Sequence, residues 1–289
     1  MNGNIKMTVS RAEDGRPLQD FLAARLALTK RAAKAIVDLR RVWVNRKVVW
    51  MARHALKTGD VVEAPAAEAK AKSIRAGVKK PEKKTHVRIL VETPNYIVCD
   101  KPAGMLSNSG AKSVEAVLRE QTGIDTLVAV HRLDRDTTGC LLCAKTRHAF
   151  EAAVEVFKTH RVTKTYFAIA AGKFPYRHHT VDSALEGKRA LTTISLQRCT
   201  ADASLLKVSI ETGRTNQIRR HLAQIRFPVI GDRLFGLKNA RDARIMSVPR
   251  QMLHAGDLEL PDPMREDGTI KAHSPLPADF RATLKLFGL

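Results

Sequence analysis

The sequence predicts an α+β fold in two parts: a small N-terminal module of two helices and three short strands, and a larger domain in which strands and helices alternate. Two observations predict it. Apolar residues recur with helical or strand periods along most of the chain. This pattern stops over residues 64–86, where Ala and Lys dominate and large apolar side chains are almost absent, so we expect a basic linker there.

The N-terminal module is predicted over residues 10–63 and begins with two short helices. Residues 17–26 place Leu and Phe at helical spacing after Pro17, and residues 30–38 follow with Thr29 as the N-cap. Short strands are predicted at 42–44, 47–49 and 60–63, with tight turns at 45–46 and 58–59.

The larger domain is predicted over residues 87–289. Its strand-like stretches are 87–92, 96–99, 140–144, 164–170, 190–197 and 205–211. Its helical stretches are 113–121, 147–159 and 215–225. The sequence has no internal repeat at a fixed period.

The charge of the chain indicates a polyanionic partner. The 289 residues include 50 Lys and Arg against 29 Asp and Glu, a formal net charge of +21, and more than half of this excess lies in the first 86 residues. Such a field concentrates polyanions around the protein, so nucleic acid is the first candidate partner.

Several function classes lose support. The four cysteines are too sparse for a disulfide framework, and the CxxC spacing of Cys140 and Cys143 lacks the second ligand pair of a zinc site, so we expect a reducing, cytoplasmic compartment and no metal. No apolar stretch is long enough to span a membrane. Phosphate-loop, dinucleotide-binding and serine-hydrolase motifs are also absent, so we expect no cofactor.

The densest polar segment is HRLDRDTTG, residues 131–139, which lies between two apolar stretches. A solvated loop is one interpretation; the other is an active carboxylate presented at the end of a buried strand. Asp136 is the alternative candidate for the active carboxylate. Asp134 and Asp136 together suggest the two carboxylates of a glycosidase, although a strongly basic protein is a poor match for neutral sugars.

A second polar segment, residues 213–221, follows a predicted strand and opens a helix. Helical spacing places Arg214, Gln217 and His221 near one face, which indicates either phosphate contacts or a solvated surface.

Four segments in the expected order resemble the RluA-like family of RNA pseudouridine synthases, the large-subunit ribosomal RNA type. HRLDRDTTG at 131–139 is similar to the signature around the family's catalytic aspartate. DKPAG at 100–104, KTY at 164–166 and ETGRTNQIRRHLA at 211–223 are similar to three further family segments, and LHA at 253–255 extends the resemblance over about residues 87–289. The chain departs from the family's usual residues at Thr138 and Asn216, where Ser and His are common.

The resemblance implies an α+β fold with a mixed or antiparallel sheet, isomerisation of uridine without a cofactor, and a set of site residues. It assigns catalysis to Asp134, a salt bridge with Asp134 to Arg214, and stacking on the target uracil to Tyr166. Arg132 is expected to fill the space left by a flipped nucleotide, and His131 to support the loop beside it. Further RNA contacts are expected from Lys101, for which a surface position beside a turn is the alternative, and from Gln217.

The N-terminal module resembles an S4-type RNA-binding domain. Its basic residues are expected to contact the RNA backbone: Lys30, Arg31, Lys34, Arg40 and Arg41. Ribosomal RNA is the favoured partner, transfer RNA the second, and a monomer is expected. The competing hypotheses are a noncatalytic RNA-binding protein on the same fold and a basic DNA-binding protein, which explains the charge but not the motifs.

Overall fold

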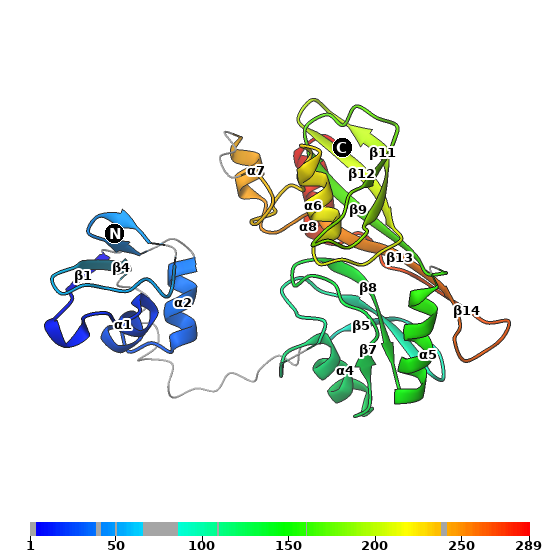
Figure 1. The fold of residues 1–289 in the computed structure, drawn as a ribbon, viewed down its shortest axis with the longest axis horizontal. Helices are drawn as coiled ribbons and strands as arrows, with labels where there is room; N and C mark the ends of the chain where they lie inside the picture. Colours follow the sequence, from blue (N-terminus) through cyan, green and yellow to red (C-terminus); the bar gives the residue numbers. More distant parts are fainter. Residues whose placement is uncertain are drawn as a thin grey trace. The chain divides into compact units, whose positions relative to one another are not determined.

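The computed structural model describes residues 4–38, 42–49, 51–65, 86–108, 110–159, 161–237 and 242–289. The chain divides into two compact units, residues 1–84 and 85–289, which are described separately (Figure 1). Most of the expected linker, and with it the expected contacts Arg40 and Arg41, lie outside the described residues.

The N-terminal unit is a four-stranded antiparallel sheet beside two helices. The strand order is β1 (Asn4–Thr8), β4 (Val61–Pro65), β2 (Trp43–Val44) and β3 (Lys47–Val48). A 3-10 turn, η1 (Arg11–Glu13), precedes helices α1 (Leu18–Arg25) and α2 (Lys30–Asp38). The hydroxyl of Thr29 accepts a hydrogen bond from the N–H of Ala32, which confirms the expected cap. Strand β1 extends the sheet to residues before the predicted start at residue 10.

The larger unit is built on a ten-stranded mixed sheet. Its main path runs β10 (His178–Asp182), β11 (Leu191–Cys199), β12 (Ala203–Ile210), β9 (Thr163–Ala171), β13 (Leu253–Pro261), β8 (Thr138–Ala144), β6 (Tyr96–Lys101) and β5 (Arg88–Glu92). Beside this path, β14 (Thr269–His273) pairs with β13, and β7 (Val128–Ala129) pairs with β8. The α+β class with a mixed sheet is confirmed, and the pairing of β13 with β8 is parallel.

Helices cover this sheet (Figure 1). They are α4 (Val114–Thr122), α5 (Arg147–Lys158), α6 (Gln217–Gln224) and α8 (Ala278–Leu286), whereas the short α7 (Ala243–Ser247) stands away from the sheet. Helix α6 packs into the main core through Ile218 and Leu222, and its His221 is hydrogen-bonded to the hydroxyl of Thr192 on β11 at 2.9 Å. These contacts fix the N-terminus of α6 relative to the sheet.

Close packing between β8 and β13 positions the loop that precedes β8. Gly139 has a φ of +109°, and a Cβ there would lie 2.1 Å from the carbonyl oxygen of Ala255 on β13. Only glycine accommodates both the backbone conformation and this approach. Tyr166 of β9 pairs with the same Ala255, so β13 brings Tyr166 and the 131–139 segment together.

Candidate active site

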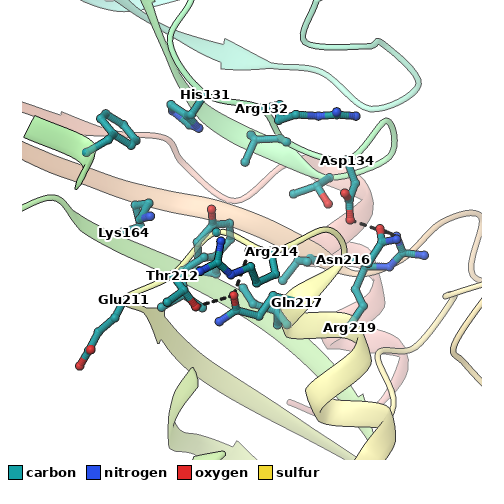
Figure 2. A pocket seen from close by; sticks show the side chains of 18 of the residues that line it. His131, Arg132, Asp134, Lys164, Glu211, Thr212, Arg214, Asn216, Gln217 and Arg219 are labelled. Atoms are coloured by element: carbon teal, nitrogen blue, oxygen red, sulfur yellow. Dashed lines mark hydrogen bonds and ion pairs between the residues drawn. The ribbon is translucent and has the colours of Figure 1, made fainter. Parts of the chain in front are cut away.

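The two polar segments singled out in the sequence line one cavity of about 560 Å³ (Figure 2). One wall is the loop before β8, with His131, Arg132 and Asp134; Tyr166 of β9 lies in another wall. The third wall is the segment from Ile210 to Arg219, which ends in the first turn of α6. Segments separated by about 80 residues in sequence therefore meet at one site.

Asp134 forms an ion pair with Arg219, not with Arg214. The Asp134 carboxylate lies 3.0 Å from Nη1 of Arg219, and the arginine side chain is only 5% exposed whereas that of Asp134 is 28% exposed. The prediction of an Arg214 salt bridge was wrong. Helix α6 begins at Gln217, after Asn216 with a φ of +55°, so Arg219 is within the helix and Arg214 precedes it.

Arg214 nevertheless lines the same cavity. Its Nε donates a hydrogen bond to the carbonyl oxygen of Arg189 at 3.1 Å, which holds the side chain beside the loop between β10 and β11. A catalytic role for Arg214 stays a prediction.

Lys101 is fully buried beneath the Asp134 loop, which corrects both the expected surface position and the expected phosphate contact. Its Nζ donates to the carbonyl oxygens of Pro102, Arg135 and Thr137 at 3.0, 2.8 and 2.9 Å. All three ammonium protons are therefore used within the protein. Burial lowers the pKa of Lys101 to about 8.

A second buried cation, which the sequence analysis did not single out, holds the same loop. Arg250 donates from Nη1 to the carbonyl oxygen of Asp136 at 3.0 Å, and its Nε and Nη2 bind the Asp279 carboxylate at 2.7 and 2.9 Å. The Ser107 hydroxyl accepts from the N–H of Leu133 at 2.9 Å. The backbone on both sides of Asp134 is thus fixed from within the protein.

Tyr166 is 7% exposed and lines the cavity. Burial raises the pKa of its phenol, and the nearby charge of Asp134 adds to that shift. The phenol is therefore neutral at physiological pH, so the side chain offers an aromatic face and an O–H donor.

His131 and Arg132 are adjacent in sequence but differ in their surroundings. The Nε2 of His131 accepts a hydrogen bond from the N–H of Leu142 at 3.1 Å, and its ring stacks on Phe157 at 5.3 Å, so it supports the loop while lining the cavity. Arg132 is exposed at the cavity.

Gln217 does not have the free amide that an RNA contact requires. Its Oε1 accepts from the Thr212 hydroxyl and the N–H of Arg214, and its Nε2 donates to the Leu191 carbonyl and the Thr192 hydroxyl. The side chain is 3% exposed. The structure therefore corrects this prediction: Gln217 ties the cavity wall to β11.

Lys164 is a cavity residue that the sequence analysis quoted within KTY without assigning it a role. Its ammonium lies over the ring of Phe157 at 5.6 Å, and burial lowers its pKa. Its position two residues before Tyr166 on β9 was the signal that could have identified it, because alternate residues of a strand share a face.

Known proteins match both units of the chain. A family model described as RNA pseudouridylate synthase matches residues 95–224, and an S4 domain model matches residues 16–62. A protein of Haemophilus ducreyi named ribosomal large subunit pseudouridine synthase D is 30% identical over 86% of this chain and 83% of that protein. This chain belongs to the RNA pseudouridine synthases.

Further relatives agree with this membership. A synthase of the same name from Xanthomonas campestris pv. campestris is 32% identical over 68% of this chain and 67% of that protein. Ribosomal large subunit pseudouridine synthase C of Haemophilus influenzae is 28% identical over 99% of this chain and 96% of that protein. The solved structure of human RNA pseudouridylate synthase domain containing 1 has a TM-score of 0.58, with 24% identity over 68% of this chain and 86% of that one, and supports the fold.

The described part of this pseudouridine synthase contains no cluster of three or more metal-ligating side chains. None of its described helices is long and apolar enough to cross a membrane.

In the S4 unit of the synthase, the expected RNA contacts are only partly described. Lys30 is exposed and forms an ion pair with Asp20 at 3.1 Å. Lys34 is exposed on α2, and Arg31 belongs to the same helix. The basic surface of α2 stays a prediction.

Replacing Lys101 with methionine should destabilise the larger unit of the synthase. Methionine keeps most of the side-chain volume but leaves three carbonyl groups without their donor, so we expect unfolding free energy to fall by about 3 kcal/mol. Urea unfolding monitored by circular dichroism measures this change. The exposed Lys271, which pairs with Glu259 on β13, is the matched control, and Lys271→Met should change stability by less than about 1 kcal/mol. Equal stability of the Lys101 variant and wild type would contradict the assigned role.

His131 should make the synthase sensitive to acid. Burial lowers its pKa to about 3, against an ordinary value of 6.5, so the unfolded chain binds this proton as pH falls through 6.5 and the folded protein does not. The unfolding free energy is therefore unaffected by this group above pH 6.5 and decreases as the pH falls from 6.5 toward 3, because protonation favours the unfolded chain. Between pH 7 and 5, His131→Gln should lose about 1–2 kcal/mol less stability than wild type, because glutamine has no such titration. Urea midpoints at both pH values measure the difference, and parallel losses would rule it out.

Proposed function

We propose that this synthase converts uridine to pseudouridine in ribosomal RNA, with Asp134 as the catalytic carboxylate. One observation carries the proposal: the partly exposed carboxylate of Asp134 faces the cavity, is held by the buried Arg219, and shares that cavity with the neutral phenol of Tyr166. Asp136, its rival in sequence, is not among the residues that line the cavity.

The reaction requires no external reactant. The N1–C1′ bond of uridine breaks, the base turns, C5 bonds to C1′, the C5 hydrogen leaves as a proton, and N1 gains a proton. We assign to Asp134 the stabilisation or attack that allows the glycosidic bond to break. Tyr166 stacks on the uracil and serves the C5 proton transfer.

The target nucleotide must leave its helix to reach this site. Unstacking and unpairing a base costs a few kcal/mol. The cavity volume lies within the usual range of small-molecule sites, about 300–1,000 Å³. Arg132, exposed at the cavity, is our candidate to occupy the space that the nucleotide leaves. Lys164 and Arg214 supply positive charge for the neighbouring phosphates.

Ribosomal RNA is the proposed substrate because the curated relatives act, by their names, on the large ribosomal subunit. The net charge of +21 and the S4 domain suit a large structured RNA. We propose that the synthase acts as a monomer in the cytoplasm, with residues 87–289 as the catalytic part.

Release of tritium tests the proposed function. Unmodified ribosomal RNA labelled with tritium at C5 of uridine should lose label when incubated with the wild-type protein, because bond formation at C5 expels that hydrogen. Labelled transfer RNA is the parallel substrate. Release from transfer RNA alone would overturn the ribosomal assignment, and bound RNA without release from either would overturn the reaction.

Removing the S4 unit should weaken binding without unfolding the rest. The two units are separately compact, so deletion of residues 1–86 is expected to leave 87–289 folded. The deletion removes a large share of the positive charge, so RNA affinity should fall and its dependence on salt concentration should flatten. Filter binding at several salt concentrations measures both effects. Unchanged affinity and salt dependence would contradict the role given to the S4 unit.

A further inference from the structure

A pair of stacked rings stands at the β10 edge of the ten-stranded sheet, outside the cavity. The chain has three tyrosines, of which Tyr96 and Tyr166 are buried, whereas Tyr176 is 51% exposed. The Tyr176 ring lies nearly parallel to that of His179, with 4.9 Å between the ring centroids and 16° between the ring planes. Neither residue lines the cavity around Asp134, so the proposed reaction does not use them.

The stacked pair is anchored in the core of the larger unit. Phe174 is buried in the main core and stands nearly perpendicular to the rings of Tyr176 and His179, at centroid distances of 5.8 and 6.2 Å. Phe174 also packs against Phe227 at 5.0 Å. His179 shares a face of β10 with Val181, which is buried in the same core. The two rings are therefore held in place before a ligand arrives, and binding on them orders little of the protein.

Strand pairing places this pair on the same face of the sheet as Tyr166. His179 pairs with Ile194, Ile194 with Val208, and Val208 with Tyr166, so these residues form one row across four strands. Neighbouring strands lie about 4.8 Å apart, so the backbones of His179 and Tyr166 are about 14 Å apart. One strand of a B-form duplex advances about 3.4 Å per nucleotide, so a polynucleotide with one base in the cavity reaches the stacked pair within a few nucleotides.

The surroundings of the stacked pair are basic. Lys173 and Arg177 are exposed on either side of Tyr176 in sequence, and Arg226 is exposed just beyond the C-terminus of α6. Residues 171–181 include no Asp or Glu, and in the turn between β11 and β12 the carboxylate of Asp202 is paired with an arginine of α7 at 2.7 Å. An exposed aromatic face between cations suits the two repeating parts of RNA, its bases and its phosphates.

We propose that Tyr176 and His179 form a stacking platform for an unpaired base of the RNA substrate, other than the nucleotide that enters the cavity. The exposed face of the Tyr176 ring receives the base, and Lys173 and Arg177 contact the neighbouring phosphates. The proposal rests on the proposed function only in taking RNA as the substrate. Because every base has a π-face, the platform adds affinity for RNA beside the cavity without reading its sequence.

Tyr176→Leu tests the platform in the full-length protein with unmodified ribosomal RNA. Leucine keeps an apolar side chain but has no aromatic face, so filter binding should show a Kd about five- to tenfold higher than that of wild type. Tyr176→Phe keeps the ring and should bind within about twofold of wild type. The slope of log Kd against log salt concentration should be the same in both variants, because stacking releases no counterions from the RNA.

Leu286→Ala is the matched control. It removes an exposed apolar side chain from α8, which packs on the opposite face of the sheet against Ile169 and Leu205. Its Kd for the same RNA should stay within about twofold of wild type.

Cross-linking locates the contact in the wild-type protein, without any substitution. Ribosomal RNA transcribed with 4-thiouridine is bound to the protein and irradiated, and the cross-linked tryptic peptides are identified by mass spectrometry. We expect the peptide of residues 174–177 among them. Its absence would overturn the platform.

The binding measurements can also contradict the proposal. A Kd of Tyr176→Leu within twofold of wild type would overturn the platform, as would equal losses of affinity in the leucine and phenylalanine variants. These measurements score binding and not turnover. A wild-type protein that binds RNA through Tyr176 but releases no tritium would therefore overturn the proposed reaction and support the platform.

Discussion

Replacing Asp134 with asparagine is expected to lower kcat by about 10⁴-fold or more, the loss typical of a group that acts on the reacting atoms. The amide keeps the size of the carboxylate but removes its charge and most of its nucleophilicity. RNA affinity should stay within about threefold, because the other cavity cations stay in place. Tritium release from C5-labelled ribosomal RNA measures turnover, and filter binding measures affinity.

Asp136→Asn is the matched control for this experiment. It makes the same chemical change two residues later in the same loop, at a side chain that does not line the cavity. We expect its turnover to stay within about threefold of wild type. The opposite pattern, an inactive Asp136 variant and an active Asp134 variant, would exchange the roles of the two carboxylates.

The sequence predicted the segments of the site better than their mutual contacts. HRLDRDTTG and GRTNQIRRH stood out because polar residues followed buried strands, and both line the cavity. Which arginine meets Asp134 depends on where α6 begins. The left-handed conformation of Asn216 starts the helix at Gln217, and no periodicity in the sequence encodes that residue's φ.

Buried charges account for most of the remaining differences. Lys101 was expected to contact RNA, or else to lie at the surface beside a turn, and lysine is almost never fully buried without partners. Two of its three partners are carbonyl groups of a loop more than 30 residues away in sequence, which residue patterns do not indicate. Arg250 and Asp232 lie in irregular segments, where no sequence periodicity marks them. Their importance emerges only from their contacts, those of Arg250 with the carbonyl oxygen of Asp136 and of the buried Asp232 with Arg219.

The strands that were missed are short or interrupted. Strands β10 and β14 have five residues each, and in both the exposed residues are polar. Strand β13 contains a glycine and an irregularity between Ala255 and Asp257, where its pairing with β9 shifts register. Such a strand breaks the alternation on which prediction depends, and in this fold it carries the backbone that positions both Gly139 and Tyr166.

Replacing Arg219 with methionine is expected to lower kcat by about 10²- to 10³-fold, because it removes a preorganised charged donor from Asp134, the proposed catalytic carboxylate. The variant should also lose about 3–5 kcal/mol of stability, since Asp232 becomes an unpaired buried charge. Turnover by tritium release and unfolding free energy in urea are measured on the same preparation. The loss of turnover is assayed at a temperature where circular dichroism shows a folded protein, so that it reflects the site and not the folded fraction.

Arg214→Met makes the same replacement five residues earlier and distinguishes the role of Arg214 from that of Arg219. Within the described residues, the Arg214 side chain binds a backbone carbonyl at the cavity wall and no carboxylate, so its variant should raise KM for RNA by about tenfold, leave kcat within about threefold, and keep its stability. The two variants together compare the ion pair seen in the structure with the one inferred from family resemblance. A larger loss of kcat in the Arg214 variant than in the Arg219 variant would mean that Arg214 becomes the partner of Asp134 once RNA is bound, and that the Arg219 pair belongs to the free enzyme alone.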